Sequence, residues 1–291
     1  MLLVLASIWG SSFMFIKVGL RQLEPSVLVC GRLVLAAVTL LFIVATRSPL
    51  CDALRALPQH WRAFVVVSLL NSVVPFWFLA WGETRIDSSL AALLQACTPL
   101  FTALIAAAFV PAERVGGARL LGVIVGFGGV ALLVGAVPHG NLLGALAVVA
   151  SGVCYAASAL VGARRLRDLP ATTIALGTTV YASVFSFPFA LAQLPDSVPG
   201  WKVIGSVVVL GVLGLGFAYI LYFTLITRAG ASRALLVTYL VPPMALFYGA
   251  TVLGESLQPT DFAGLALILA GVSLGTGAVQ RLRRRPVAAE T

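Results

Sequence analysis

Hydrophobic residues form long runs along this chain, and polar residues gather in the short segments between the runs. Each run has about 20 residues, which is the length that an α-helix needs to cross a bilayer. A membrane β-barrel would instead alternate apolar and polar residues. The pattern therefore predicts an all-α membrane protein with ten transmembrane helices, at approximately residues 2–20, 26–46, 62–82, 88–110, 117–137, 141–163, 171–193, 203–226, 231–253 and 260–279.

Composition excludes a water-soluble protein. Charged residues make up only 10% of the 291 residues and hydrophobic residues 60%, whereas a soluble domain carries about 25% charged residues to cover its surface. Ten helices with short connections use nearly the whole chain, so no separate soluble domain is expected. Met1 is followed directly by apolar sequence without a small-residue cleavage site. We interpret this as a retained first helix, with a native start further upstream as the open alternative.

The basic residues predict how the helices are oriented in the membrane. Of the 19 Lys and Arg residues, 14 fall in the segments on the side of the amino terminus and three in the segments on the opposite side. Because cytoplasmic segments carry the excess of Lys and Arg, both termini are predicted to be cytoplasmic. Basic residues scattered in this way do not form a single patch, so we expect the lipid bilayer as a partner and no nucleic acid.

Cysteine and glycine spacing excludes several kinds of site. The four cysteines occur singly, at Cys30, Cys51, Cys97 and Cys154. Neither a disulfide framework nor a metal site is therefore expected.

Gly122-x-x-x-Gly126 and Gly271-x-x-x-Gly275 are patterns that let two membrane helices approach closely, and none follows a strand as a nucleotide-binding loop requires. We expect no cofactor and no catalytic residue.

The two halves of the chain resemble each other. At a constant offset of 143 positions, Thr84, Ser89, Ala91 and Pro99 correspond to Thr227, Ser232, Ala234 and Pro242. This self-similarity indicates an internal repeat of five helices. An odd number of helices inverts the second copy in the membrane, and inverted repeats are typical of transporters that alternate between inward-open and outward-open states. We expect repeats at residues 1–137 and 138–280 and a basic cytoplasmic tail at residues 281–291.

Three segments carry a resemblance to a known family. They are Trp9-Gly10-Ser11-Ser12-Phe13 followed by Lys17, Ala91-Ala92-Leu93-Leu94-Gln95 leading to Thr98-Pro99, and Gly254-Glu255 before the last run. Together with the repeat, they resemble the EamA family of the drug/metabolite transporter superfamily over essentially the whole chain. The resemblance implies a ten-helix protein of the cell inner (plasma) membrane that exports amino acids or other small metabolites. The chain departs from the family pattern at Pro111-Ala112-Glu113, where Gly-Glu is usual, and at Tyr155, where tryptophan is common.

Polar side chains inside the hydrophobic runs are the candidates for solute binding, because such groups usually face the interior of a helix bundle. Gln95 and Tyr239 each lie one turn before a proline that frees a backbone carbonyl. Aromatic rings with a hydroxyl one turn away begin both halves and suit a small amphipathic solute. The predicted substrate-binding residues are Trp9, Ser12, Asn71, Phe78, Gln95, Tyr155, Ser158 and Tyr239. The alternative for each is a hydrogen bond or a packing contact between helices.

Charged residues near the runs carry a different expectation. Lys17 and Arg32 have side chains long enough to reach the headgroups, and the alternative for Arg32 is to neutralise a substrate carboxylate. The acidic residues lie at the ends of runs, so a proton relay through buried carboxylates is not expected. Glu83 is the candidate if protons are coupled, and uniport or exchange fits the sequence equally well.

The leading hypothesis is a secondary transporter, working as a monomer, that exports a small solute by rocking two five-helix halves about a central site. The main alternative is an intramembrane lipid-processing enzyme. Such an enzyme needs a nucleophile with its base, or a metal, near the middle of the membrane, and His60 and His139 both fall in connections. A channel would need a selectivity filter, and no segment resembles one.

Overall fold

The computed structural model describes residues 1–47, 50–109, 116–136, 141–230, 234 and 236–275. These residues form an all-helical protein without strands. The predicted basic tail at residues 281–291, the Pro111-Ala112-Glu113 segment, His139 and Ser232 lie outside the described residues.

The helices occur where the hydrophobic runs predict them. The first four runs correspond to α1 (Leu2–Gly19), α2 (Pro25–Arg47), α4 (Trp61–Ser68) with η1 (Leu69–Val73) and α5 (Val74–Glu83), and α6 (Ser88–Gln95) with α7 (Thr98–Phe109). The next three are α8 (Ala118–Gly135), α9 (Leu142–Arg165) and α10 (Ala171–Leu191). The last three are α11 (Trp201–Val208) with η4 (Val209–Phe217) and α12 (Ala218–Ala229), α14 (Val237–Tyr248) with η5 (Gly249–Leu253), and α15 (Pro259–Gly275). Within the described residues, eight of these helical stretches are long and apolar enough to span a membrane, and Val237–Leu253 and Pro259–Gly275 are shorter apolar helices.

A further short helix, α3 (Leu50–Gln59), lies in the connection between α2 and α4. It buries Ala53, Ala56 and Leu57 and leaves Asp52 and Arg55 exposed. Apolar residues three and four positions apart make one face of such a helix. It is too short to cross a bilayer, so a pattern of apolar runs of about 20 residues does not predict it.

Several spans are not regular α-helices. The wide π-helical turns η1 and η4 interrupt the third and eighth runs, and η5 ends the ninth. The fourth run is divided between α6 and α7 just before Pro99, whose ring nitrogen has no hydrogen to donate to the preceding turn. Single π-helical turns occur frequently at functional sites because they disturb the regular backbone hydrogen bonds.

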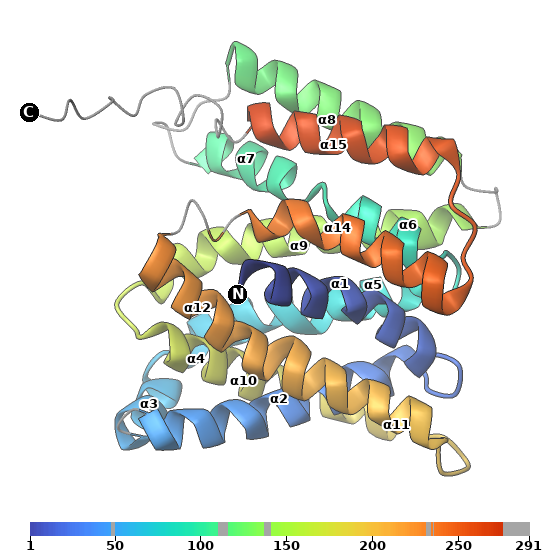
Figure 1. Cartoon of the computed structure of the whole chain (residues 1–291). Helices are drawn as coiled ribbons and strands as arrows, with labels where there is room; N and C mark the ends of the chain where they lie inside the picture. The colour runs from blue at the N-terminus through green and yellow to red at the C-terminus, as the bar shows by residue number, and fades with distance from the viewer. Residues whose placement is uncertain (48–49, 110–115, 137–140, 231–233, 235, 276–291) are drawn as a thin grey trace, which may run out of the picture.

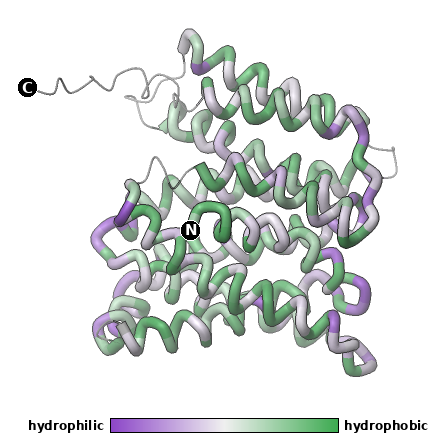
Figure 2. Tube along the Cα trace, viewed as in Figure 1, coloured by the Kyte–Doolittle hydropathy of each residue, from purple (hydrophilic) through white to green (hydrophobic). Residues whose placement is uncertain are grey.

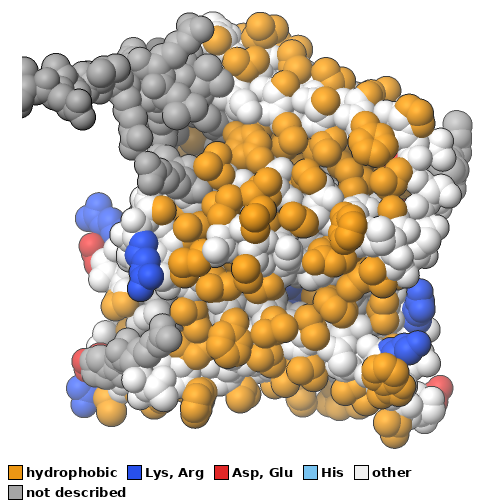
Figure 3. Space-filling view, in the orientation of Figure 1, with side chains coloured by type: hydrophobic (Ala, Val, Ile, Leu, Met, Phe, Trp, Pro, Cys, Tyr) orange, Lys and Arg blue, Asp and Glu red, His pale blue; other side chains and the backbone are white. Residues whose placement is uncertain are grey.

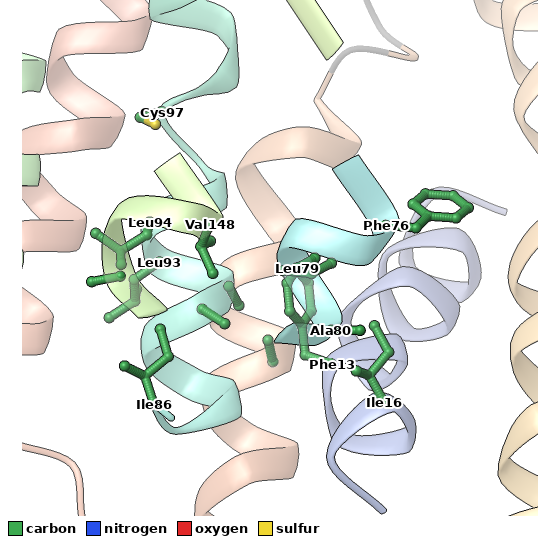
Figure 4. Close-up of a cluster of buried hydrophobic side chains, with 14 of the residues drawn as sticks. Phe13, Ile16, Phe76, Leu79, Ala80, Ile86, Leu93, Leu94, Cys97 and Val148 are labelled. Atoms are coloured by element: carbon green, nitrogen blue, oxygen red, sulfur yellow. The ribbon is translucent and has the colours of Figure 1, made fainter. Parts of the chain in front are cut away.

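The helices pack in well-defined pairs. In Figure 1, α8 and α15 lie side by side at the top of the molecule, and α2 lies against α10 at the bottom. Between these pairs, α1 packs on α14 and α5 packs on α9. The largest buried cluster joins side chains from α1, α5, α6 and α9, including Phe13, Leu79, Leu93 and Val148 (Figure 4).

The outer surface is that of a protein embedded in lipid. Hydrophobic side chains cover the middle of the face in Figure 3, and Lys, Arg, Asp and Glu gather at its left and right edges. Figure 2 likewise shows the hydrophilic segments at the two ends of the helices. Large apolar side chains such as Phe42 and Phe189 are 71% and 66% exposed, which water would penalise and hydrocarbon does not.

Glycines bring α8 and α15 into backbone contact. A Cβ atom added to Gly271 would collide with the backbone of Gly126 and would lie 2.6 Å from the carbonyl oxygen of Gly122. A Cβ atom added to Gly122 would in turn meet the backbone of Gly271 and Gly275. The predicted small-xxx-small patterns therefore form one tight helix pair.

We expect Gly271→Val to destabilise the protein, because a side chain there must push two backbones apart. Overpacking of this kind typically costs about 1–3 kcal/mol. Thermal unfolding in detergent, followed by circular dichroism, should give a melting temperature several degrees lower. Gly128→Val is the matched control, because Gly128 on α8 faces open space; equal losses for both variants would contradict the close contact.

Candidate functional site

A buried cation lies at the centre of the candidate site. Arg32, on α2, is only 5% exposed. The Cζ atom of its guanidinium lies 4.1 Å from the centre of the Phe76 ring on α5. Its Nε atom is buried without a hydrogen-bond partner, and Arg32 forms no ion pair within the described residues. The headgroup-reaching position predicted for Arg32 is therefore wrong, because the side chain turns inward onto an aromatic ring.

Aromatic and polar side chains from three other spans surround this cation. The Tyr155 ring on α9 lies 6.3 Å from the Phe76 ring, centre to centre. Tyr155 and Tyr219, the latter on α12, both lie within electrostatic range of Arg32. The side chain of Asn71 in η1 interacts with the Tyr219 hydroxyl. We call Arg32, Asn71, Phe76, Tyr155 and Tyr219 the arginine cluster.

Two of the predicted binding residues, Asn71 and Tyr155, belong to the arginine cluster, and two others lie against η4. The indole Nε1 of Trp9 donates a hydrogen bond of 3.2 Å to the Gly214 carbonyl oxygen, and its ring packs on Tyr222 at 5.5 Å. Ser12, one turn further along α1, donates to the Ile8 carbonyl oxygen at 2.9 Å. Trp9 thus uses a carbonyl in a wide turn, where regular helical hydrogen bonds are disturbed.

The other four predicted residues have mainly structural contacts. Gln95 donates to the Thr98 hydroxyl at 2.9 Å and accepts from the Ser151 hydroxyl at 2.6 Å, so it links the fourth span to α9. Tyr239 packs against the largest buried cluster. Phe78 contacts the Trp77 ring, and Ser158 is buried at 3% exposure. Phe78, Gln95, Ser158 and Tyr239 do not line either of two cavities of about 730 and 580 Å³. A role in solute binding for these four residues therefore stays a prediction.

Three members of the arginine cluster were not predicted as substrate-binding residues from the sequence. Arg32 was expected at the headgroups, with a role at a substrate carboxylate as the alternative, Tyr219 was not among the predicted binding residues, and Phe76 is one apolar residue among many in its run. The available signal was Arg32, a charged residue eight positions into a 23-residue helix. Phe76 could be found only from the fold, because nothing distinguishes its sequence context.

A second group of charges lies where α1, α5 and α6 meet. The ammonium of Lys17 donates hydrogen bonds of 2.7 Å to the carbonyl oxygens of Glu83 and Ile86. These carbonyls close the carboxyl end of α5, where a positive charge is favourable. The headgroup-reaching position of Lys17 stays a prediction, because the half-buried side chain binds carbonyls at the end of a neighbouring span.

Two carboxylates near Lys17 have opposite environments. Glu83 is 0% exposed, and neither of its carboxylate oxygens has a hydrogen-bond partner among the described residues. Glu255 accepts hydrogen bonds from the amide and hydroxyl of Ser88, at 2.8 Å each, and from those of Ser89, at 2.9 and 2.5 Å. Because these donors form the amino-terminal end of α6, Glu255 acts as a cap supplied by a distant part of the chain.

Hydrogen bonding controls the charge of Glu255, which lies between η5 and α15. Burial alone raises the pKa of this carboxyl, and the hydrogen bonds from Ser89 and Ser88 outweigh burial, so the pKa lies below its usual value. Glu255 is thus held as the ionised acceptor that the end of α6 requires. Within the described residues, no three His, Cys, Asp or Glu side chains gather to hold a metal ion.

These features are those of a polytopic α-helical membrane protein with polar groups buried between its spans. The chain belongs to the EamA-like transporter family, whose model matches residues 1–135 and again residues 142–276. The EamA family is part of the drug/metabolite transporter superfamily.

Similar proteins are named as transporters. An uncharacterized transporter of Archaeoglobus fulgidus is 27% identical over 270 residues, covering 91% of this chain and 93% of the relative. A probable terminal-alkyne amino-acid exporter of Streptantibioticus cattleyicolor is 29% identical, covering 91% and 89%. The inner membrane transporter YedA of Escherichia coli is 25% identical, covering 99% and 93%. A solved crystal structure superposes with a TM-score of 0.68 over 96% of both chains at 19% identity, which supports the same fold.

We expect acid to weaken the folded protein through Glu255. A carboxyl whose pKa is depressed on folding contributes stability above its unfolded pKa of about 4.3, and this contribution disappears as the pH falls through the folded value. The wild-type melting temperature should therefore fall between pH 6 and pH 3.5. Glu255→Gln should start lower at pH 6, since an amide is a weaker acceptor, and should fall less; an equally steep fall in both proteins would contradict this role.

Proposed function

We propose that the protein is a secondary transporter that exports small amphipathic metabolites, amino acids or similar solutes, across the inner membrane. The observation that carries this proposal is the buried Arg32 guanidinium within the arginine cluster, whose Nε has no hydrogen-bond partner and which forms no ion pair among the described residues. A buried cation without a partner is costly in a membrane protein and commonly marks a substrate pathway. We conclude that a solute carboxylate is the missing partner of Arg32.

The rest of the arginine cluster suits the remainder of such a solute. The rings of Phe76 and Tyr155 offer an apolar surface, and the side chains of Asn71 and Tyr219 offer hydrogen-bonding groups. A binding site of this kind combines apolar walls with a few placed polar groups. The similarity to a probable terminal-alkyne amino-acid exporter supports an amino-acid-like solute.

Alternating access of two inverted repeats, residues 1–137 and 138–280, is the proposed mechanism. The double match of the family model supports two copies. The packing supports a two-fold relation between the copies: α1 packs on α14 as α9 packs on α7, and α2 packs on η4 as α10 packs on α4. Under a shift of 143 positions η1 falls within η4, so both copies carry a wide turn in the same span. Arg32 and Phe76 come from the first copy and Tyr155 and Tyr219 from the second, so rocking the copies would open and close the cluster.

The proposed orientation has both termini in the cytoplasm, with Lys17, Glu83 and Glu255 toward the outer side. The contacts of Lys17 and Glu255 then hold the outer ends of the spans together, and the solute leaves when these ends separate.

The proposed monomer needs no second chain for this movement. An enzyme is not favoured, since the similar proteins are named as transporters.

We expect Arg32→Gln to reduce transport at least tenfold, because the solute carboxylate loses its charged partner. A tenfold loss corresponds to about 1.4 kcal/mol, and a hydrogen bond to a charged group contributes about 1.5–3 kcal/mol, so tenfold is the smallest loss expected. The measurement is uptake of a panel of labelled L-amino acids into everted membrane vesicles. Arg55→Gln is the matched control, because its side chain is 76% exposed on α3. Arg32→Lys should retain part of the activity, and full activity of Arg32→Gln would refute the carboxylate assignment.

We expect Tyr155→Phe to reduce transport by about two- to tenfold, which is the effect of losing one hydrogen bond of about 0.5–1.5 kcal/mol. The loss should appear in the apparent affinity for the solute, measured from initial rates in the same vesicles. Tyr248→Phe, a half-buried tyrosine outside the arginine cluster, should leave the affinity unchanged. If both variants behave alike, Tyr155 contributes packing only.

A further inference from the structure

The carboxylate of Glu83 is an ionisable group in a position where a charge is costly. It ends α5, is 0% exposed, and has no hydrogen-bond partner at either oxygen. An ionised carboxylate buried without hydrogen bonds is strongly unfavourable, and such a group lowers its free energy by taking up a proton. Glu255, close enough to interact with Glu83, has four hydrogen bonds and does not face this cost.

The neighbours of Glu83 do not replace the missing partners. The charged groups that act on it are Lys17 from α1, Arg32 from α2 and Glu255 from the segment before α15. The Lys17 ammonium donates hydrogen bonds to two backbone carbonyls, and none to the Glu83 carboxylate among the described residues.

Two further helices pack near this end of α5. The amino-terminal groups of α6 are occupied by Glu255, and α9 meets the adjacent Gly82 with Gly144 and Val148, which carry no charge. A proton is therefore the simplest neutraliser of Glu83.

The position of Glu83 connects it to the arginine cluster. Glu83 follows Phe76 by seven residues on α5, which is two helical turns and hence the same face. Arg32 contacts the Phe76 ring and interacts electrostatically with both Glu83 and Tyr155. The charge on Glu83 is thus felt at the site proposed for the solute.

We propose that Glu83 is the proton-binding residue that couples solute export to proton entry. Its carboxylate takes one proton from the outer solution to become the neutral acid, the outer ends close over it, and the proton is released to the cytoplasm after the opposite side opens. A solute ammonium is the other group that neutralises this carboxylate, so proton and solute compete for Glu83 and are exchanged one for one. The inference rests on the proposed transport function and adds its energy source.

Proteoliposomes separate coupling from transport itself. With a mixture of labelled L-amino acids outside, an acid-inside gradient of one pH unit drives one-for-one exchange toward about tenfold accumulation. We expect wild-type protein to accumulate label under this gradient and to exchange labelled for unlabelled amino acids without it. Glu83→Gln should lose the gradient-driven accumulation and retain only a weaker exchange, because the solute ammonium loses its carboxylate partner.

Glu24→Gln is the matched control, because it makes the same chemical change on an exposed carboxylate just before α2. It should keep gradient-driven accumulation. Accumulation by Glu83→Gln equal to that of the wild type would overturn the proposal, and so would wild-type exchange that does not respond to the gradient.

Thermal unfolding in detergent without any solute tests Glu83 independently of transport. If the closed protein binds a proton at Glu83, its melting temperature rises as the pH falls from 8 to 6, because stability increases with proton binding to the folded state. Glu83→Gln should melt at or above the wild-type value at pH 6 and show no such rise. The same pH dependence in both proteins would refute proton binding by Glu83.

If the wild type moves no amino acid of the mixture, the proposed solute class fails, while the melting experiment still decides the role of Glu83.

Discussion

The hydrocarbon of the bilayer supplies no hydrogen bonds, and this constraint explains most of the polar contacts in the structure. Every buried polar group must find its partner inside the protein or remain costly. Lys17, Gln95 and Glu255 meet the constraint with short hydrogen bonds to helix ends or to side chains of other spans. Arg32 and Glu83 do not meet it. Groups that violate the constraint are the natural places to look for function, because a solute or a proton can satisfy them.

The satisfied groups also hold the ends of distant segments together. Glu255 follows the ninth run, and the serines that it binds begin the fourth. Lys17 ends the first run and binds the end of the third. Such contacts use backbone groups at helix termini, which are unsatisfied in every helix. They therefore tie spans together without polar side chains in the middle of the membrane.

The sequence was informative wherever a property repeats over many residues. Runs of about 20 apolar residues located the spans to within a few residues, since length and hydropathy decide membrane insertion. Asn71 was a candidate because polar atoms inside such runs are rare, and Tyr155 because an aromatic ring with a hydroxyl one turn away begins each half. The wide turns, the short α3 and the role of Phe76 were missed, because each depends on packing between segments far apart in the chain. Glu83 was judged by its position at the end of a run, and only the fold reveals that this end is buried.

The arrangement of tight and irregular helices indicates where movement can occur. The α8 and α15 pair meets backbone to backbone at glycines, and the α2 and α10 pair packs along its length on the opposite side of the molecule (Figure 1). Close-packed interfaces of this kind resist gradual deformation. The spans between the pairs contain η1, η4, η5 and the break between α6 and α7. They also carry Trp9, Tyr219 and Glu83, so a change in shape at the wide turns would move the polar groups that the solute and the proton are proposed to meet.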